Sequence, residues 1–201
     1  MTEIERNALK LLEADCLKCT DCPLHTTRTQ VVFGTGNPEG GIMLIGEGPG
    51  EQEDLRGEPF VGPAGKLLDD MLTLIGLDRS KVYIANIVKC RPPRNRDPLN
   101  SEQDICRAWL DRQIRIIKPK LILCLGRVAA AQIISANFKI TKDHGKWYQQ
   151  EGRKIMAIYH PSALLRDESK RPETFADLRE FRKMVRQYYP DYYEKELQHH
   201  V

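Results

Sequence analysis

Residues 42–54 of the chain read IMLIGEGPGEQED, and this stretch decides the fold class. Four aliphatic residues, 42–45, run directly into a glycine-rich acidic loop, as a buried strand does when it ends at the edge of a sheet. Three further apolar runs have the same character: 82–88 (VYIANIV), 121–125 (LILCL) and 155–159 (IMAIY). Each run is short, aliphatic and closed by Gly, Lys or His, so each is predicted to be a buried strand.

Helical patterns lie around and between these runs. Apolar residues recur at helical spacing over 3–14, 64–76, 101–118, 127–135 and 173–188. Strands that alternate with helices form a parallel sheet whose two faces are covered. The sequence therefore predicts an α/β fold, a three-layer sandwich with a central four-stranded parallel sheet.

The length of 201 residues suits one domain with its own core. We expect a single domain over 1–201, with an N-terminal helix and cysteine loop over 1–25 and a C-terminal helix and tail over 173–201. A net charge of +3 permits nucleic acid as a partner without indicating it. No apolar run approaches the ~20 residues that span a bilayer, and the charged N-terminus lacks a signal peptide's apolar core. We expect a cytoplasmic monomer without a membrane partner.

The unusual residues of the sequence follow the four predicted strands. They are GEGPGEQED at 46–54, the segment 86–96, the pair Gly126-Arg127, and HPSALLR at 160–166. In open α/β sheets, ligands bind beyond the carboxyl ends of the strands. The four loops are therefore predicted to form one site.

Several of these residues allow two interpretations. The acidic loop could be a solvated turn, and its four acids argue against phosphate binding. Asn86 in a buried strand must satisfy a donor and an acceptor, either as a polar bridge in the core or by reading the edge of a base. His160 could be a turn residue or could stabilise a developing anion. The basic segment 89–96 (KCRPPRNR) could be a solvated loop or could contact phosphates.

The cysteines indicate a metal or cluster site, because disulfides are rare in a reducing compartment. Five of them are candidates for four ligand positions: Cys16, Cys19, Cys22, Cys90 and Cys106. Cys124 lies in the middle of an apolar run and is predicted to be a core residue. Four thiolates suit zinc or an iron–sulfur cluster, so spacing alone leaves both open.

Taken together, GEGPGEQED…PFVGPAG, NIVKCRPP and HPSALLR resemble the motifs of the family 4 uracil-DNA glycosylases, the thermostable-type enzymes with a [4Fe–4S] cluster. The resemblance spans roughly residues 16–166 in the family order and includes RTQVVFG and LGRVAA. It implies a uracil-DNA glycosylase-like fold. It also implies a monofunctional enzyme that flips uracil out of single- or double-stranded DNA and hydrolyses its N-glycosidic bond, initiating base excision repair.

The resemblance assigns roles around the base. Glu47 and Gly48 would form the wall of the uracil pocket, Phe60 would stack on the ring, and Asn86 would pair with its edge. His160 would point at uracil O2 and stabilise the departing anion. One rival interpretation is a non-catalytic iron–sulfur protein on the same fold, and the presence of Asn86 and His160 argues against it. The others are a zinc-stabilised binding module and an enzyme of the same superfamily that acts on other deaminated bases.

Two glycines of the first motif stand where other uracil-DNA glycosylases carry functional side chains, so other residues must take over those roles. Gly48 stands where the best-studied uracil-DNA glycosylases carry an Asp that orients water, as is usual in family 4. Glu47 and Glu53 are the candidates to replace it, with Glu47 preferred for the water and Glu53 for pocket shape. Gly50 stands where those enzymes place a Tyr against the thymine methyl group, so another group must exclude thymine.

Contacts to DNA follow from the same resemblance. Leu164, four residues after the histidine, matches the side chain that fills the gap left by the flipped nucleotide. Ser162 and Arg166 would contact backbone phosphates, and Arg91 and Arg94 of the basic segment are expected beside them. A related branch links covalently to DNA through a His in a basic insert; RPPRNRDP has neither, so turnover is expected.

The resemblance also selects cluster ligands. Cys22 holds the family's spacing to RTQVVFG, which maps the four ligands of the [4Fe–4S] cluster to Cys19, Cys22, Cys90 and Cys106. Cys16 is then the spare cysteine.

Overall fold

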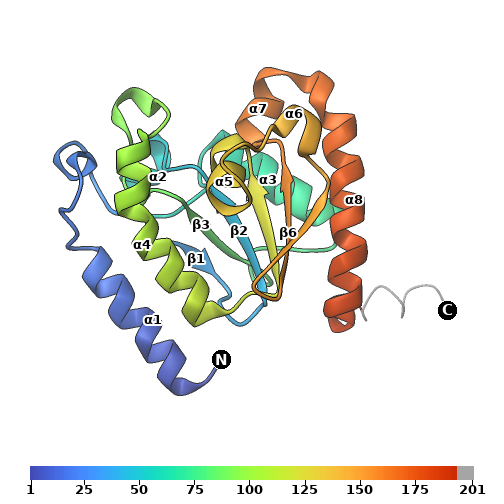
Figure 1. Cartoon of the computed structure of the whole chain (residues 1–201), viewed down its shortest axis with the longest axis horizontal. Helices are drawn as coiled ribbons and strands as arrows, with labels where there is room; N and C mark the ends of the chain where they lie inside the picture. Colours follow the sequence, from blue (N-terminus) through green and yellow to red (C-terminus); the bar gives the residue numbers. More distant parts are fainter. Residues whose placement is uncertain (194–201) are drawn as a thin grey trace.

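Four parallel strands form the centre of the sheet in the computed structural model, which describes residues 1–193 (Figure 1). The strand order is β1-β3-β2-β4-β6-β5. The parallel strands are β2 (Ile42–Gly46), β3 (Tyr83–Asn86), β4 (Leu121–Leu125) and β6 (Arg153–Ile158). Each coincides with one of the four apolar runs, which confirms the predicted four-stranded parallel sheet.

The sheet extends beyond this centre by two antiparallel edge strands that the sequence analysis did not predict. β1 (Thr35–Gly36) pairs with β3, and β5 (Trp147–Gln150) pairs with β6. β1 has only two residues, and β5 is exposed at its two glutamines. Neither shows an apolar run or an alternation, which are the signals that predict strands.

The five predicted helices are present with boundaries shifted by up to two residues. They are α1 (Glu3–Cys16), α3 (Pro63–Leu74), α4 (Asn100–Ile117), α5 (Arg127–Ile133) and α8 (Arg171–Tyr188). Three short helices occupy segments without a predicted helix: α2 (Glu51–Arg56), α6 (Ile140–Asp143) and α7 (Pro161–Arg166). None of them exceeds 6 residues, which is too short to show a helical repeat. Short 3-10 turns complete the chain: η1 (Pro23–Thr26), η2 (Pro93–Asn95), η3 (Glu168–Lys170) and η4 (Pro190–Tyr193).

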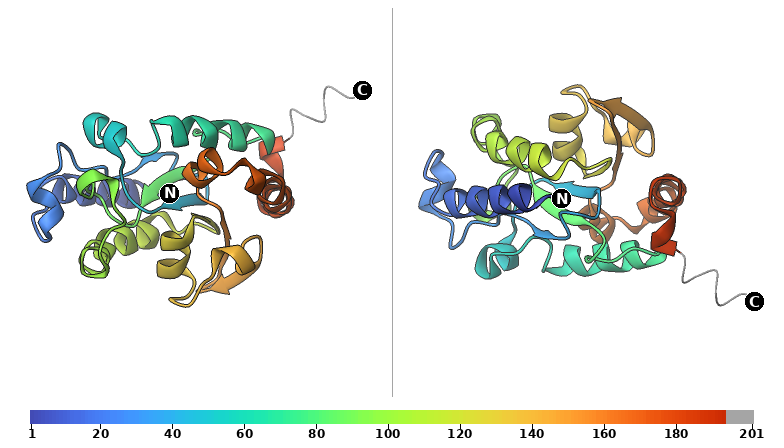
Figure 2. Two further views of the ribbon diagram at one scale, coloured as in Figure 1. Left: turned by 90° about the horizontal axis from the view of Figure 1, so that it is seen from above. Right: turned by 90° about the horizontal axis from the view of Figure 1, so that it is seen from below.

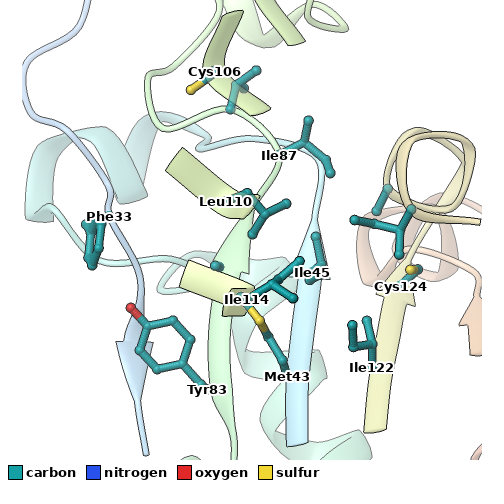
Figure 3. Packing of buried hydrophobic residues seen from close by; sticks show 14 of the residues in the cluster. Phe33, Met43, Ile45, Tyr83, Ile87, Cys106, Leu110, Ile114, Ile122 and Cys124 are labelled. Carbon is teal, nitrogen blue, oxygen red and sulfur yellow. The ribbon is translucent and has the colours of Figure 1, made fainter. Parts of the chain in front are cut away.

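The helices cover both faces of the sheet and give it two cores (Figure 2). On one face α1, α4 and α5 share a core with alternate strand residues such as Met43 and Ile45. Figure 3 shows Leu110 and Ile114 of α4 beside these two strand residues. On the other face α3, α7 and α8 pack against Ile42 and Leu44. Cys124 is fully buried in the first core, as predicted. This arrangement is the expected three-layer sandwich.

The path of the chain opens a crevice at the carboxyl edge of the sheet. α3 connects β2 to β3 across one face, and α4 connects β3 to β4 across the other. The order of the strands therefore reverses around β2, and the loops that leave neighbouring strands there diverge. Such a reversal is where open α/β sheets bind their ligands.

The last described residues, 189–193, cover the opposite, amino edge of the sheet. The hydroxyls of Tyr189, Tyr192 and Tyr193 donate to backbone carbonyls of Gly41 (3.1 Å), Gly40 (2.8 Å) and Ile75 (2.8 Å), respectively. The N-terminal ammonium of Met1 lies there too, 3.4 Å from a Glu39 carboxylate oxygen. The remainder of the predicted tail, 194–201, lies outside the described residues.

No helix within residues 1–193 combines the length and apolarity needed to cross a bilayer.

Candidate functional site

A cavity of about 540 Å³ opens at the carboxyl edge of the sheet, where the loops after the four parallel strands meet. Eight of the residues selected from the sequence line it: Glu47, Gly48, Glu53, Phe60, Asn86, His160, Ser162 and Arg166. Leu164, Arg91 and Arg94 do not. Segments more than 100 positions apart in the sequence thus converge on one cavity, as the strand-end argument predicts.

Asn86, the last residue of β3, lies in the wall of the cavity and is 1% exposed. Its Oδ1 has no hydrogen-bond partner among the described residues. An unpaired buried acceptor is costly, which makes it a site for a donor on a ligand. Of the two interpretations left open by the sequence, this orphaned oxygen favours recognition of a ligand over a polar bridge in the core.

Gly46, paired with Asn86 across β2 and β3, lets the amide and the Phe60 ring come together. A methyl group at Gly46 would lie 2.4 Å from Asn86 Oδ1 and 2.7 Å from Phe60 Cζ. At either distance the asparagine or the phenylalanine side chain would have to move. The wall therefore combines an aromatic ring with one unpaired carboxamide oxygen, a combination suited to a flat heterocycle.

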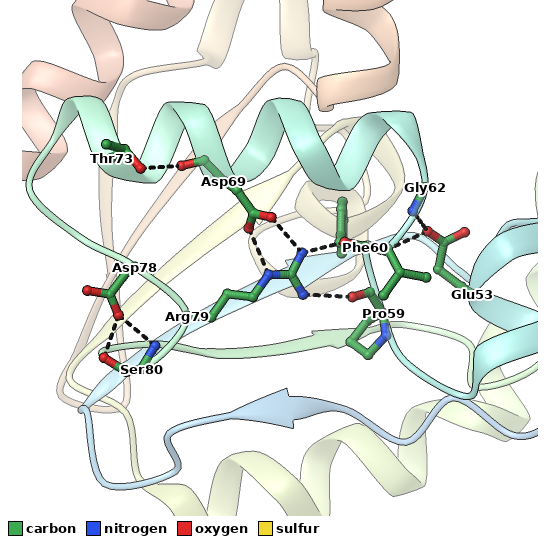
Figure 4. Close-up of polar contacts among 10 residues, drawn as sticks. Glu53, Pro59, Phe60, Gly62, Asp69, Thr73, Asp78, Arg79 and Ser80 are labelled. Carbon is green, nitrogen blue, oxygen red and sulfur yellow. Dashed lines mark hydrogen bonds and ion pairs between the residues drawn. The ribbon is translucent and has the colours of Figure 1, made fainter.

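The backbone of Phe60 is held in an uncommon conformation by residues that the sequence analysis missed. Its φ is 55°, in the left-handed region that bulky residues avoid. Arg79, paired with Asp69 at 2.7 Å, donates to the Phe60 carbonyl and at 3.2 Å to that of Pro59 (Figure 4). Gly65 leaves room for the same carbonyl, because a methyl group there would lie 1.8 Å from it. Over-determined strain of this kind is typical of functional sites.

Glu53 organises the acidic loop from within. Its carboxylate accepts from the backbone N–H groups of Gly50 (3.1 Å), Val61 (2.8 Å) and Gly62 (2.8 Å). Figure 4 shows the contact with Gly62. These bonds join the start of α2 to the segment that carries Phe60, which fits a role in pocket shape.

Asp54, the last acid of the motif, is buried and has a structural role that the sequence analysis did not assign. It accepts from the backbone N–H groups of Thr29 (2.9 and 3.0 Å) and Gln30 (3.3 Å). The acidic loop is thereby attached to the segment after the cysteine loop.

Glu47, a half-buried acid of the motif, also lines the cavity. Burial raises the pKa of its carboxyl to about 7, and the nearby Asp97 acts in the same direction. Arg127 and Arg166 oppose this shift in pKa. Asp97 and Arg127 pair at 2.6 Å, and both line the cavity. A carboxyl that titrates near neutral pH in a cleft is typical of a general base or a water-orienting group.

His160 caps α7 and is held in one tautomer. Its Nδ1 accepts from the backbone N–H of Ser162 at 3.1 Å and lies 2.8 Å from the Ser162 hydroxyl. Burial lowers the pKa of the imidazole to about 4, and Arg166 adds to the effect while Glu53 opposes it. The ring is therefore neutral at pH 7, and because Nδ1 accepts, the proton is on Nε2. Its centroid lies 5.5 Å from that of Phe60.

The structure corrects the placement of Leu164. This side chain is 0% exposed and packs in the core between α3, α8 and the sheet. A leucine in that position cannot enter DNA without leaving the core. The next residue, Leu165, is 45% exposed on α7. Helical rather than loop geometry over 161–166 turns the two leucines in different directions.

The basic segment contributes to the cavity through different residues from those expected. Arg94 is exposed and Arg91 donates to Asn95 Oδ1 at 2.7 Å, but neither lines the cavity. Asn95 and Arg96 of the same segment do. Both candidates for phosphate contact therefore lie outside the lining of the cavity.

A second, smaller cavity brings together the five cysteines that the sequence analysis selected: Cys16, Cys19, Cys22, Cys90 and Cys106. Arg28 donates to Cys90 Sγ at 3.1 Å, and the backbone N–H of Lys89 donates to Cys106 Sγ at 3.2 Å. All five cysteines are free, and no group of three in the described part of the chain is arranged to hold a single metal ion. The structure does not separate Cys16 from Cys19 as a ligand.

The five cysteines and the N–H groups that donate to their sulfurs fit a cysteine-ligated cluster. Iron–sulfur clusters take four thiolates, and N–H groups directed at the sulfurs are among the features that tune them. Burial raises the pKa of the thiols of Cys22 and Cys90, and that of Cys106 to about 12. Because ligation requires thiolates, binding of a cluster would release protons.

Comparison with known proteins agrees with this geometry. Residues 33–186 match the model of the Uracil DNA glycosylase superfamily. A type-4 uracil-DNA glycosylase of Archaeoglobus fulgidus is 47% identical over 82% of this chain and 87% of its own length. One of Sulfurisphaera tokodaii is 43% identical over 93% and 90%, and one of Thermotoga maritima is 48% identical over 76% and 80%. The chain belongs to the uracil DNA glycosylase superfamily and, within it, to the type-4 uracil-DNA glycosylases.

Proposed function

We propose that this chain is a monofunctional uracil-DNA glycosylase, which removes uracil from DNA by hydrolysing the N-glycosidic bond and so initiates base excision repair. The names of its relatives support the activity. The structural observation that carries the proposal is the unpaired Oδ1 of Asn86 in the cavity beside the Phe60 ring. It is the acceptor that the N3–H of uracil requires.

Recognition of uracil rests on one amide and one ring. The Asn86 amide accepts from N3–H through Oδ1 and donates to O4 through Nδ2, a pattern that cytosine cannot match because it has an amino group at position 4. Phe60 stacks on the face of the base. The cavity is at the surface edge of the sheet, so the nucleotide must leave the DNA stack to reach it.

His160 stabilises the leaving group. Cleavage of the bond leaves negative charge on the uracil and an oxocarbenium-like sugar. A neutral imidazole with its proton on Nε2 donates a hydrogen bond to the developing charge at O2 without transferring the proton. Such a preorganised donor in a water-poor site contributes more to the rate than it would in water.

Glu47 orients the attacking water and offsets the positive charge on the sugar. Its carboxyl, with a pKa of about 7, is partly ionised at neutral pH. Glu53, whose carboxylate already accepts three backbone N–H groups, keeps the loop in shape for Glu47 and Phe60. This divides the roles of the two acids in the way preferred from the sequence, with Glu47 for the water and Glu53 for pocket shape.

DNA lies across the mouth of the cavity. Ser162 and Arg166 line that mouth and contact backbone phosphates, and Arg91 and Arg94 add positive charge behind it. Leu165, the exposed leucine of α7, replaces Leu164 as the side chain that fills the gap left by the flipped base. The protein acts on single- and double-stranded DNA as a cytoplasmic, single-domain monomer.

Cys19, Cys22, Cys90 and Cys106 would hold a [4Fe–4S] cluster. When bound, the cluster would join the N-terminal loop to the segment after β3 and to α4, and its role would be structural rather than a part of the hydrolysis. Visible absorption near 400 nm distinguishes it from zinc.

The experiment is cleavage of single-stranded and duplex oligonucleotides that contain one uracil, with and without alkali. A monofunctional enzyme releases uracil in both substrates, and strands break only after alkali opens the abasic site. Matched oligonucleotides with thymine at the same position are the control. Absence of uracil release from both substrates by iron-loaded protein would refute the function.

A second test addresses the residue that carries the proposal. Asn86→Asp replaces the donor toward O4 by an acceptor and buries a negative charge near a departing anion, so uracil excision should fall steeply. Trace excision of cytosine should emerge, because its amino group can donate to the new carboxylate. The measurement is the ratio of uracil to cytosine excision in otherwise identical single strands. Near-full uracil activity would show that Asn86 does not read the base.

A further inference from the structure

Lys89 lies behind the uracil cavity and is one of the largest fully buried side chains of the protein. Its Nζ donates to the backbone carbonyl of Asn86 at 2.9 Å and to Gln113 Oε1 at 2.6 Å. Its backbone N–H donates to Cys106 Sγ, and the next residue is Cys90. One residue therefore contacts both the base-reading asparagine and a cysteine of the second cavity.

The partners of the ammonium group are themselves fixed. The Gln113 amide nitrogen donates to the Phe33 carbonyl at 3.0 Å and to the Tyr83 hydroxyl at 3.2 Å, which turns its oxygen toward Lys89. The Phe33 ring centroid lies 5.9 Å from Nζ. The lysine is thus held in one position by α4 and by the segment that precedes β1.

Asn86 is the last residue of β3, and Lys89 donates to its backbone carbonyl at the point where the strand ends. Beyond it the backbone N–H groups of Ile87 and Val88 still donate to the carbonyls of Gly46 (2.9 Å) and Glu47 (3.1 Å). The carbonyl of Asn86 instead accepts from the Lys89 ammonium. Its side-chain Oδ1 has no partner in the described chain that would hold the amide in place, so the direction of the amide is set by the backbone and its packing.

We propose that Lys89 is a positioning residue for uracil recognition, which fixes the peptide of Asn86 and couples its position to the cysteine-lined cavity. The inference rests on the proposed function. A buried ammonium costs free energy that an apolar side chain of similar size would avoid. Its two hydrogen bonds therefore serve the arrangement of the site: one ends on the backbone carbonyl of Asn86 and the other on Gln113 Oε1.

The test replaces Lys89 by methionine, which has a similar length and no donor. Equilibrium binding of free uracil should weaken roughly 10- to 100-fold, the range for losing a hydrogen bond from a charged group. Binding of a duplex with an abasic-site analogue, which needs no base recognition, should remain unchanged. Iron content per chain is measured in parallel, so that a defect in cluster retention is seen separately.

A double-mutant cycle separates positioning from general loss of structure. In an Asn86→Ala background, Lys89→Met should have no further effect on uracil binding, because the group that it positions is gone. Additive effects would overturn the proposal. If Lys89→Met does not fold or loses iron, Gln113→Met removes the second acceptor while keeping the charge, and it should weaken uracil binding in the same way but less.

Lys81→Met is the matched control. Its Nζ likewise makes two hydrogen bonds, here both to backbone carbonyls, those of Gly76 (2.9 Å) and Tyr192 (3.2 Å), at the amino edge of the sheet. It should lower the melting temperature and leave uracil binding unchanged. Equal losses of uracil binding in both lysine variants would overturn the positioning role. If wild-type protein neither binds nor excises uracil, it is the proposed function that fails.

Discussion

The immediate neighbours of His160 set the protonation state and the tautomer of its imidazole. Burial favours the neutral ring, and the amide N–H of Ser162 occupies Nδ1 and so puts the proton on Nε2. The residue type and its place after a strand were visible in the sequence. Its tautomer was not, because it depends on the turn that starts α7.

His160→Ala should lower the rate of the chemical step by roughly 10²- to 10³-fold, the usual cost of one oxyanion donor. Affinity for uracil-containing DNA should change far less, since the contact strengthens mainly in the transition state. Single-turnover kinetics measure the first and equilibrium binding the second. His160→Gln, which keeps an N–H donor, should recover part of the rate; unchanged kinetics in the alanine variant would remove His160 from the mechanism.

Glu47 should give the reaction its dependence on pH. If the carboxylate orients water, the single-turnover rate rises as the pH passes through about 7, and Glu47→Gln flattens this rise.

The same carboxyl makes the stability of the protein depend on pH. The folded protein binds the proton of Glu47 more tightly than the unfolded chain does. The resulting stabilisation is present below the ordinary value of 4.5 and is lost as the pH rises through about 7.

Glu47→Gln should therefore be more stable than wild type at pH 8, by roughly 1–2 kcal/mol once the partial exposure of the carboxyl is allowed for. The two proteins should converge near pH 4. Chemical denaturation at the two pH values measures the difference. A rate that rises with pH equally in both proteins would assign the titration to another group.

At the scale of elements, α7 shows where the sequence was insufficient. A segment of 6 residues after a strand has no detectable repeat, so its two leucines could not be assigned to core or surface. The long elements were predictable because each has an apolar pattern of its own. The strained turn at Phe60 was not, because it depends on Arg79, which follows it by 19 positions and shows no local signal.

Leu165→Ala should weaken excision from duplex DNA more than from single strands, because only a duplex needs a side chain to hold open a stacked site. Leu164→Ala should instead lower the free energy of unfolding by about 2–5 kcal/mol, as for other buried leucines. It should change excision from duplex and single-stranded DNA to the same extent. The ratio of duplex to single-strand rates separates the two variants. A duplex-specific defect in Leu164→Ala alone would restore it as the wedge.

At the scale of the whole molecule, the sequence predicted the four-stranded parallel sheet and the edge at which its loops meet. It also predicted most residues of the cavity, because strand ends are recognisable and parallel strands share an edge. What it could not supply were relations between distant segments, such as Asp54 with Thr29 or Lys89 with Gln113. Such pairs arise from packing and have no signature in local spacing.

The cysteine cavity is also a property of the whole molecule, since it joins α1, the loop after it, the segment that follows β3, and α4. Single alanine variants of Cys19, Cys22, Cys90 and Cys106 should each lose iron and folded yield. Cys16→Ala and Cys124→Ala should retain iron. Iron analysis of each purified variant is the measurement, and loss of iron from Cys16→Ala with retention in Cys19→Ala would shift the ligand set by one step of the CxxCxxC.

The tyrosine contacts at the amino edge bear on how the protein can be handled and connected. Met1 and Tyr193 both lie at the edge opposite the uracil cavity. A surface anchor, a fluorophore or a second protein attached at Met1 would therefore stand away from bound DNA. Immobilised through Met1, the molecule would keep its cavity facing the solution, which suits it to capture uracil-bearing strands on a solid support.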